Sequence, residues 1–376
     1  MGSDVRAQTF LDLFCGCGGF TLGMIRSGLR CLAAIDIDPV AIATLRANLV
    51  ERQESDLPIV AHALDRDLRK FKPDQLAALI GTDHAVRPGT VELPGRDDTM
   101  TANRDVTGHY SRGNLLDRLN AALAEDGVDP ARPPFDSLTP YDQFHGRGLE
   151  ATDEIANLLE VATTDHLLDI GSGIGGPARY MARRFGCRVT GIDLTAEFCD
   201  VARQLTRLLG LEARVMFELG DALAMPFAGN DFDGAYSMNV SMNIADKGGL
   251  YREIHRALKR GGWLMLSEIA KGPGADLDYP TPWAGSAKTS FLSTPEDTRR
   301  GLEDAGFEVV QMRSTAEQVK AFGARSREIV ARGEKPPHRA VMLIHGEIAP
   351  QAMANTARGI AEARIVPIEI LCRKRG

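Results

Sequence analysis

A glycine-rich loop near the middle of the chain is the segment best suited to hold a ligand. Its sequence is D-I-G-S-G-I-G-G over residues 169–176, between a predicted strand and a predicted helix. Because glycine has no side chain, a ligand can approach the backbone there, and the helix N-terminus offers free N–H groups to an anion. Taken alone, this pattern fits either a nucleotide-binding loop or a tight turn.

Two acidic residues further along the chain favour a nucleotide. Asp193 ends the next predicted strand, where a carboxylate can accept hydrogen bonds from both ribose hydroxyls. Asp221 and Ala222 follow the third strand, at a position suited to a purine. These segments together predict a site for a ligand that carries a ribose and a purine.

Candidates for contact with a second ligand follow the fourth predicted strand, because ligands lie outside the carboxyl ends of strands in such sheets. These candidates are Asn239, Ser241, Met242 and Asn243. For Met242, ordinary packing in the core is an equally good interpretation.

Further candidates lie outside that segment. His145 precedes the first strand and could close over the ligand or act as a base, or it could be a capping or surface histidine. Tyr141, Asp142 and Phe144 share the segment and the same alternatives. Trp283 lies in Y-P-T-P-W, where prolines stiffen the loop and the indole is either a pocket wall or an ordinary buried aromatic residue.

The elements that position these residues form a regular alternation of strands and helices. Apolar runs alternate with helical stretches from H-L-L-D-I, residues 166–170, to F-E-V-V-Q, residues 307–311. The tail adds the apolar run Arg339–His345, a helix, and a last strand over Ala363–Cys372. Such a series is long enough to form an α/β, doubly wound, Rossmann-like sheet.

The glycine loop also has a counterpart near the N-terminus. L-D-L-F-C-G-C-G-G at residues 11–19 aligns with L-D-I-G-S-G-I-G-G at residues 168–176, with Asp12 and Asp169 157 residues apart. Asp36 follows Asp12 by 24 residues, as Asp193 follows Asp169. We therefore expect a partial second βαβ unit over residues 1–82, a linker over 83–105, and a complete domain over 106–376 that begins with a helical lid over 106–162.

The motifs of the large domain resemble those of class I S-adenosylmethionine-dependent methyltransferases. They are L-L-D-I-G-S-G-I-G-G, G-I-D-L-T, G-D-A-L-A-M-P-F, F-D-G-A-Y-S and H-R-A-L-K-R-G-G-W-L. The resemblance implies a seven-stranded sheet with a reversed last hairpin and S-adenosylmethionine as the cofactor. It implies cofactor contacts at Asp169, Gly171, Ser172, Gly173, Gly175, Asp193, Leu194, Asp221 and Ala222.

A longer pattern, Y-D-Q-F-H, G-P-A-R-Y, S-M-N-I-A-D-K and Y-P-T-P-W-A, is similar to a group related to sarcosine and dimethylglycine N-methyltransferases. This implies a small-molecule acceptor, with nitrogen favoured and oxygen or sulfur open. The expected catalytic or base contacts are His145, Asn239 and Asn243, and the expected substrate contacts are Tyr141, Met242 and Trp283. Related sequences often have His at the position of Asn239, so if that His is a base, this chain lacks it.

The N-terminal copy carries a different resemblance, to the opening of DNA cytosine-5 methyltransferases over about residues 9–80. Its motifs are D-L-F-C-G-C-G-G-F-T-L-G-M and A-I-D-I-D. That family attacks cytosine with the thiolate of a Pro-Cys pair, and the sequence contains no Pro-Cys dipeptide. We expect a catalytically inert remnant; a second cofactor site, a regulatory module, and DNA methylation with a partner chain that supplies the missing motif remain the alternatives.

Composition limits the remaining classes. The chain has 376 residues and a net charge of −7, which argues against a nucleic-acid wrapper, so we do not expect a nucleic-acid partner. There is no apolar run of transmembrane length and no secretory signal, so we expect a cytoplasmic enzyme without a membrane partner. The six cysteines lack paired zinc-site spacing, so no metal is expected. A homo-oligomer and a non-enzymatic cofactor sensor both remain open.

Overall fold

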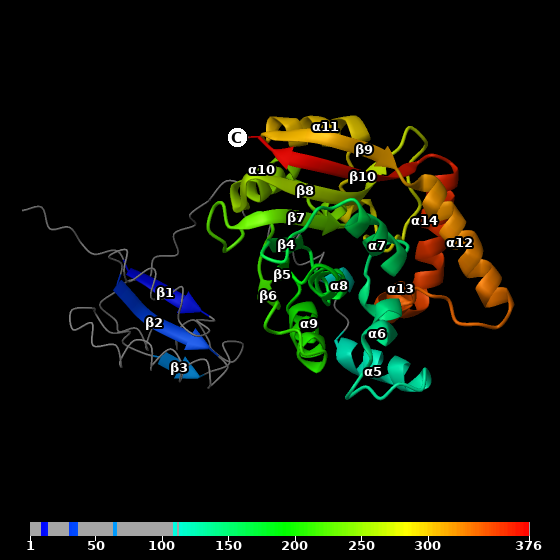
Figure 1. Ribbon diagram of the computed structural model, residues 1–376, viewed down its shortest axis with the longest axis horizontal. Helices are drawn as coiled ribbons and strands as arrows, with labels where there is room; N and C mark the ends of the chain where they lie inside the picture. The colour runs from blue at the N-terminus through cyan, green and yellow to red at the C-terminus, as the bar shows by residue number, and fades with distance from the viewer. Residues whose placement is uncertain (1–8, 14–29, 37–62, 66–107, 111–112, 376) are drawn as a thin grey trace, which may run out of the picture. The chain divides into compact units, whose positions relative to one another are not determined.

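The computed structural model describes residues 9–13, 30–36, 63–65, 108–110 and 113–375 (Figure 1). Contacts between Cα atoms divide the chain into two units, Met1–Leu93 and Pro94–Gly376.

The first unit contains a small parallel sheet. Its strands are β1 (Thr9–Leu13), β2 (Arg30–Asp36) and β3 (Ala63–Asp65), and β2 pairs with both neighbours. The expected strands around Leu11 and Ile35 are therefore present. The helices expected in this unit, the strand expected near residues 57–62, and the linker at residues 83–105 lie outside the described residues.

The second unit is built on a seven-stranded sheet in the order β6-β5-β4-β7-β8-β10-β9. Numbered in chain order, the strands of this sheet follow the order 3-2-1-4-5-7-6. The last strand, β10, runs in the opposite direction to the other six. The prediction of seven strands with a reversed last hairpin is confirmed. The strands are β4 (His166–Ile170), β5 (Arg188–Asp193), β6 (Val215–Leu219), β7 (Phe232–Met238), β8 (Leu258–Lys271), β9 (Phe307–Ser314) and β10 (Ile365–Lys374).

Helices cover both faces of this sheet. On one face α8 (Gly176–Phe185) and α9 (Ala196–Leu208) pack on β5 and β6, and on the other α10 (Lys247–Ala257) and α11 (Pro295–Asp304) pack on β8 and β9 (Figure 1). In α9 the buried residues Phe198, Val201, Ala202 and Leu205 recur at the helical spacing, so a single apolar stripe faces the core.

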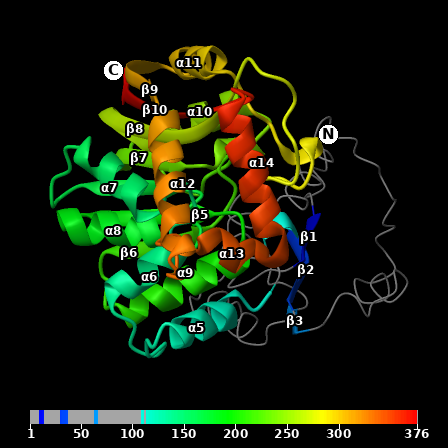
Figure 2. The same ribbon diagram turned by 90° about the vertical axis from the view of Figure 1, so that its right-hand side faces the viewer.

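The remaining helices form an outer layer beside the sheet, in which α13 packs against α5 and α6 and α14 packs against β10 (Figures 1 and 2). We keep the name lid for residues 108–110 and 113–162, the described parts of the expected lid segment. The lid contains α5 (Leu115–Glu125), α6 (Phe135–Asp142) and α7 (Leu149–Asn157), and the C-terminal part adds α12 (Ala316–Ala331), α13 (Ala340–His345) and α14 (Ala349–Ala361). The apolar run Arg339–His345 is thus a helix.

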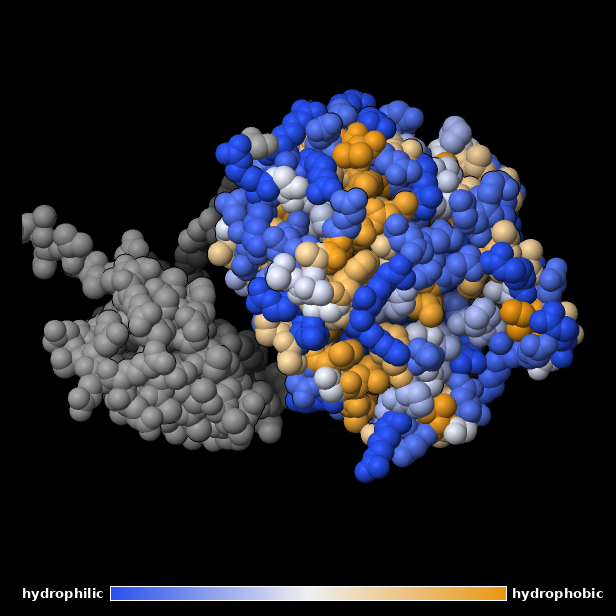
Figure 3. Space-filling view, in the orientation of Figure 1, coloured by the Kyte–Doolittle hydropathy of each residue, from blue (hydrophilic) through white to orange (hydrophobic). Residues whose placement is uncertain are grey.

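The surface of the second unit mixes hydrophobic and hydrophilic residues, with hydrophobic ones in an interrupted band down the face seen in Figure 3. The edge strand β6 exposes Met216 and Leu219, and the other edge strand, β9, exposes Val310. No helix among the described residues combines the length and apolarity needed to cross a membrane.

Candidate active site

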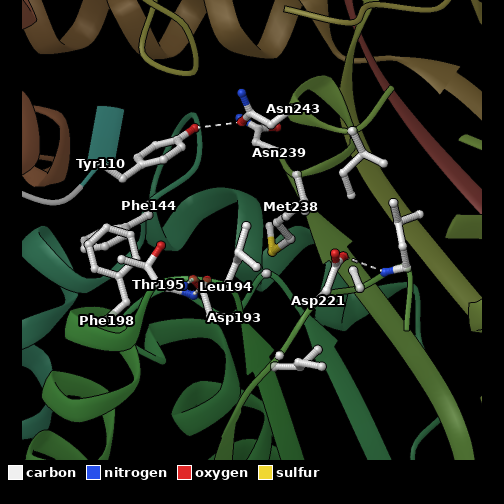
Figure 4. A pocket seen from close by; sticks show the side chains of 18 of the residues that line it. Tyr110, Phe144, Asp193, Leu194, Thr195, Phe198, Asp221, Met238, Asn239 and Asn243 are labelled. Atoms are coloured by element: carbon white, nitrogen blue, oxygen red, sulfur yellow. Dashed lines mark hydrogen bonds between the residues drawn. The ribbon is translucent and has the colours of Figure 1, made fainter. Parts of the chain in front are cut away.

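A pocket of about 370 Å³ opens where four parallel strands end. It is lined by Gly171 and Gly173 after β4, by the end of β5, by Gly220–Leu223 after β6, and by Met238–Val240 at the end of β7 (Figure 4). This is where ligands bind in open α/β sheets, and the volume falls in the usual range of about 300–1,000 Å³ for ligand pockets.

The glycine loop, residues 169–176, forms one wall of this pocket in a conformation that needs glycine. Gly171 and Gly173 have φ of 69° and 53°, in the left-handed region that other residues rarely adopt. A Cβ atom at Gly171 would lie 2.3 Å from the Val240 side chain, and one at Gly173 would lie 2.9 Å from the Phe144 ring. The loop is therefore closely packed as well as turned, and its backbone faces the pocket.

Asp193 fixes that loop from the end of β5. Its Oδ2 accepts a hydrogen bond from Gly173 N at 2.8 Å, and its Oδ1 accepts one from Thr195 N at 2.8 Å. Burial raises the pKa of Asp193, and the two backbone N–H groups oppose that shift. Each carboxylate oxygen can accept more than one hydrogen bond, so Asp193 can bind hydroxyl groups while it holds the loop.

Asp221, Ala222 and Leu194, which the sequence predicts as cofactor contacts, also line the pocket. Asp221 Oδ1 accepts a hydrogen bond from Leu223 N at 2.9 Å, which holds the turn after β6. In Figure 4, Asp221 lies across the pocket from Tyr110, Phe144 and Phe198.

Asp169, Ser172 and Gly175 do not line the pocket but support its glycine wall. Asp169 and Ser172 are 2% and 4% exposed, and among the described residues neither Asp169 Oδ2 nor Ser172 Oγ has a hydrogen-bond partner. Burial raises the pKa of Asp169 to about 8. Buried polar atoms without partners are rare, and both of these lie directly behind the glycine wall.

The third wall is aromatic. The Phe144 and Phe198 rings lie 5.2 Å apart, and the Tyr110 and Phe198 rings lie 6.2 Å apart. The Tyr110 hydroxyl donates to Asn243 Oδ1 at 3.0 Å (Figure 4). Burial raises the pKa of the Tyr110 hydroxyl, so this side chain keeps its proton at neutral pH. No pattern in the sequence singles out Tyr110 or Phe198, because each is an isolated aromatic residue.

The two predicted asparagines both line the pocket, but they differ in what their polar groups do. Asn239 adopts a left-handed φ of 59° directly after β7. Asn243 lies in a single helical turn, η2 (Ser241–Asn243), and its Nδ2 donates to the carbonyls of Trp283 at 2.7 Å and Thr289 at 3.1 Å. Asn243 therefore joins Tyr110 to a neighbouring loop, which is a positioning role.

Four predicted contacts lie behind the pocket walls instead of in them. Tyr141 donates to Asp126 Oδ2 at 2.8 Å, and Met242 and Trp283 pack together in a separate hydrophobic cluster. His145 is 4% exposed and lies 3.0 Å from Thr152 Oγ1, and burial lowers its pKa to about 3. We therefore revise the roles expected for these residues: all four support the walls, and His145 is a neutral core residue within the lid.

The part of the chain that the structure describes holds no group of three or more His, Cys, Asp or Glu side chains able to bind a metal ion. The described thiols of Cys187, Cys199 and Cys372 are free and buried.

Comparison with known proteins identifies two families. Residues 168–266 match a family described as a methyltransferase domain, and residues 8–80 match the C-5 cytosine-specific DNA methylases. The glycine loop and the strands that frame the pocket fall in the first match.

Individual relatives agree with the first match. Methyltransferase GfsG of Streptomyces halstedii is 30% identical over 224 residues, which are 59% of this chain and 79% of that protein. Phosphoethanolamine N-methyltransferase 3 of Arabidopsis thaliana is 34% identical over 166 residues, 43% of this chain but only 33% of the plant enzyme.

A solved structure shares the fold. Phosphoethanolamine N-methyltransferase 2 of Haemonchus contortus, in complex with phosphomonomethylethanolamine and S-adenosylhomocysteine, superposes with a TM-score of 0.53 at 20% identity. The superposition covers 71% of this chain and 61% of that one.

Proposed function

The chain belongs to the class I S-adenosylmethionine-dependent methyltransferases, and we propose that it transfers the cofactor's methyl group to a nitrogen atom of a small molecule. The observation that carries the proposal is one pocket with two kinds of wall. Glycine backbone and two aspartates form one part, and Tyr110, Phe144 and Phe198 form the other. The first part suits the cofactor, and the second leaves room for an acceptor.

The described residues fit S-adenosylmethionine. Asp193 would bind the ribose hydroxyls, Asp221 and Ala222 would contact the adenine, and the backbone at Gly171 and Gly173 would face the methionine portion. The bound cofactor supplies a methyl group on a positively charged sulfur. The protein then has to align the acceptor with that methyl group and exclude water, because in-line displacement needs no further chemistry from a side chain.

The titratable groups support nitrogen as the acceptor atom. Among the described residues that line the pocket these groups are Tyr110, Asp193, Asp221 and Asp246. Tyr110 keeps its proton, and Asp246 Oδ1 accepts a hydrogen bond from Gly249 N at 2.7 Å, where it caps α10. An amine attacks with a free lone pair once its ammonium group has lost a proton to water, whereas an alcohol needs a base during the attack itself. The acceptor chemistry named for the plant and nematode relatives is also methylation at nitrogen.

Calorimetric titration with S-adenosylhomocysteine tests the cofactor half of the proposal. We expect one site per chain, lost or much weakened by Asp193→Ala and unchanged by Asp36→Ala, the equivalent position in the N-terminal copy. A single site that depends on Asp36 would contradict the proposal. Two sites would overturn the expectation that the N-terminal copy is an inert remnant.

An acceptor screen tests the second half. The protein is incubated with S-adenosylmethionine labelled in its methyl group and with primary and secondary amines, phosphoethanolamine and glycine included, each paired with the corresponding alcohol or thiol. We expect label in the amines and none in their paired alcohols. If the protein binds the cofactor but transfers its methyl group to none of these compounds, the result would favour a cofactor sensor instead.

DNA cytosine methylation is the second candidate, because residues 8–80 match the DNA methylases and their described strands form a parallel sheet. The absence of a Pro-Cys pair from the sequence argues against it. Incorporation of label into duplex DNA by the chain alone, or together with a partner, would support this alternative.

A further inference from the structure

A buried ion pair joins the lid to the helix that follows the glycine loop. Arg179 Nη2, on α8, donates to Asp142 Oδ2, at the end of α6, over 2.9 Å, and the two side chains are 0% and 3% exposed. Removing two charges from water costs several kcal/mol per ion, so such a pair is weak evidence of general stabilisation. Its position suggests a different use.

The same guanidinium also holds the glycine loop. Arg179 Nη1 donates to the carbonyl of Ile174 at 2.8 Å, and Thr206 Oγ1 on α9 lies 3.3 Å from it. Ile174 lies between Gly173 and Gly175. The two ends of one planar side chain therefore bind the lid and the loop together, which a lysine ammonium, a single point charge, cannot reproduce.

The lid backbone at this point is in close contact with the start of α8 and with the pocket. A Cβ at Gly176 would lie 2.2 Å from Asp142 O. Two residues beyond Asp142, the Phe144 ring lies over Gly173 and lines the pocket. A shift of Asp142 relative to Arg179 would therefore move both Phe144 and the loop that faces the cofactor.

We infer that Asp142 and Arg179 are positioning residues for cofactor binding: their ion pair holds the lid wall at Phe144 and the glycine loop at Ile174 in the arrangement that binds S-adenosylmethionine. This inference rests on the proposed function of the pocket. Neither residue lines the pocket, so their effect on affinity is transmitted through Phe144 and the loop.

The chain offers a matched control on the same two helices. Asp136 on α6 and Arg183 on α8 form an ion pair of 3.6 Å, and their side chains are 90% and 55% exposed. This pair bridges the same elements but touches neither the loop nor the pocket, and exposed pairs contribute little.

The test is a double-mutant cycle read out as affinity for S-adenosylhomocysteine. Asp142→Asn, Arg179→Lys and the double variant are titrated at a temperature well below each variant's Tm, beside Asp136→Asn, Arg183→Lys and their double variant. We expect each buried single variant to weaken binding about 10- to 100-fold and the double variant to be little weaker than either single one, because they disrupt one unit. The exposed pair should change affinity less than twofold.

Several results would overturn the inference. Wild-type affinity in folded Asp142→Asn would show that the pair only stabilises the fold. Fully additive losses in the buried pair would show that the two residues do not act as one unit. If Asp142→Asn does not fold, Asp142→Glu replaces it in the test. This variant keeps the charge but displaces the carboxylate, and we expect it to weaken S-adenosylhomocysteine binding to the same extent. The proposed function fails separately, since it requires the wild-type protein to bind S-adenosylhomocysteine at all.

Discussion

The buried carboxyl of Asp169 makes the stability of the second unit depend on pH in a way that one substitution should remove. Asp169 is 2% exposed, and burial raises its pKa to about 8, with the nearby Asp193 charge raising it further and Tyr236 and Arg179 lowering it. Asparagine has the shape of a protonated aspartate but does not titrate. The Asp169→Asn variant should therefore behave as the wild type does at low pH.

The magnitude follows from proton linkage. The unfolded chain releases this proton near pH 4, whereas the folded protein keeps it until about pH 8, so the contribution to stability is fully present below pH 4 and is lost as the pH rises through 8. Between pH 6 and pH 8 the wild type should lose about 2 kcal/mol that the variant does not lose. For a unit of this size that corresponds to roughly 4 °C in Tm.

The assay is thermal unfolding of the wild type and of Asp169→Asn at pH 6, 7 and 8 without cofactor. Titrating groups that do not interact with Asp169 affect both proteins equally, so the quantity of interest is the difference between their Tm values. Asp231→Asn, a change at an exposed aspartate, is the control and should follow the wild type. If the difference between wild type and Asp169→Asn stays constant from pH 6 to pH 8, the argument from burial is wrong.

The remaining predictions concern the walls of the pocket and the core beneath it. Tyr110→Phe removes the hydroxyl that donates to Asn243 Oδ1, so we expect the KM for the acceptor to rise about 3- to 10-fold, in steady-state kinetics, with the Kd for S-adenosylhomocysteine unchanged. Gly171→Ala adds a Cβ 2.3 Å from Val240 at a left-handed φ, so calorimetry should show S-adenosylhomocysteine binding weakened at least 10-fold. Leu205→Ala empties a fully buried site on α9, and chemical denaturation should show a loss of about 2–5 kcal/mol in the free energy of unfolding.

Much of the sheet was predictable because its strands are buried on both faces. H-L-L-D-I in β4 and F-D-G-A-Y-S-M in β7 read as short apolar runs, and both strands are almost entirely buried. The reversed last hairpin follows from the resemblance to methyltransferases and not from periodicity.

The helices outside the sheet were harder to predict. Helix α6 contains Pro140 and follows a proline-rich turn, so local sequence argues against it, and only its packing on α8 and α5 makes it a helix. Helix α12 buries no residue completely and therefore has no clear apolar stripe. The apolar run that becomes α13 has no periodicity long enough to separate a helix from a strand.

The pocket likewise combines residues that the sequence predicts and residues that it does not. Residues on the strand ends, such as Gly171, Asp193 and Asp221, could be predicted because the chain order of a βα series determines where each strand terminates. The second wall depends instead on tertiary packing: Tyr110 and Phe144 come from segments before the first strand of the sheet, and Phe198 comes from α9. No local sequence pattern indicates that these three rings line one cavity.

This difference has a physical consequence for how the pocket can vary. The wall formed by the glycine loop and the end of β5 is held by backbone hydrogen bonds, such as those from Gly173 N and Thr195 N to Asp193. A change there therefore disturbs the turn after β4 or β5. The aromatic wall is held by side-chain packing and by the Tyr110–Asn243 hydrogen bond, so its shape can change without loss of the sheet. Acceptor preference should therefore respond to substitutions at Tyr110 and Phe198, while affinity for the cofactor should respond to the loop and to whatever positions the loop, Arg179 included.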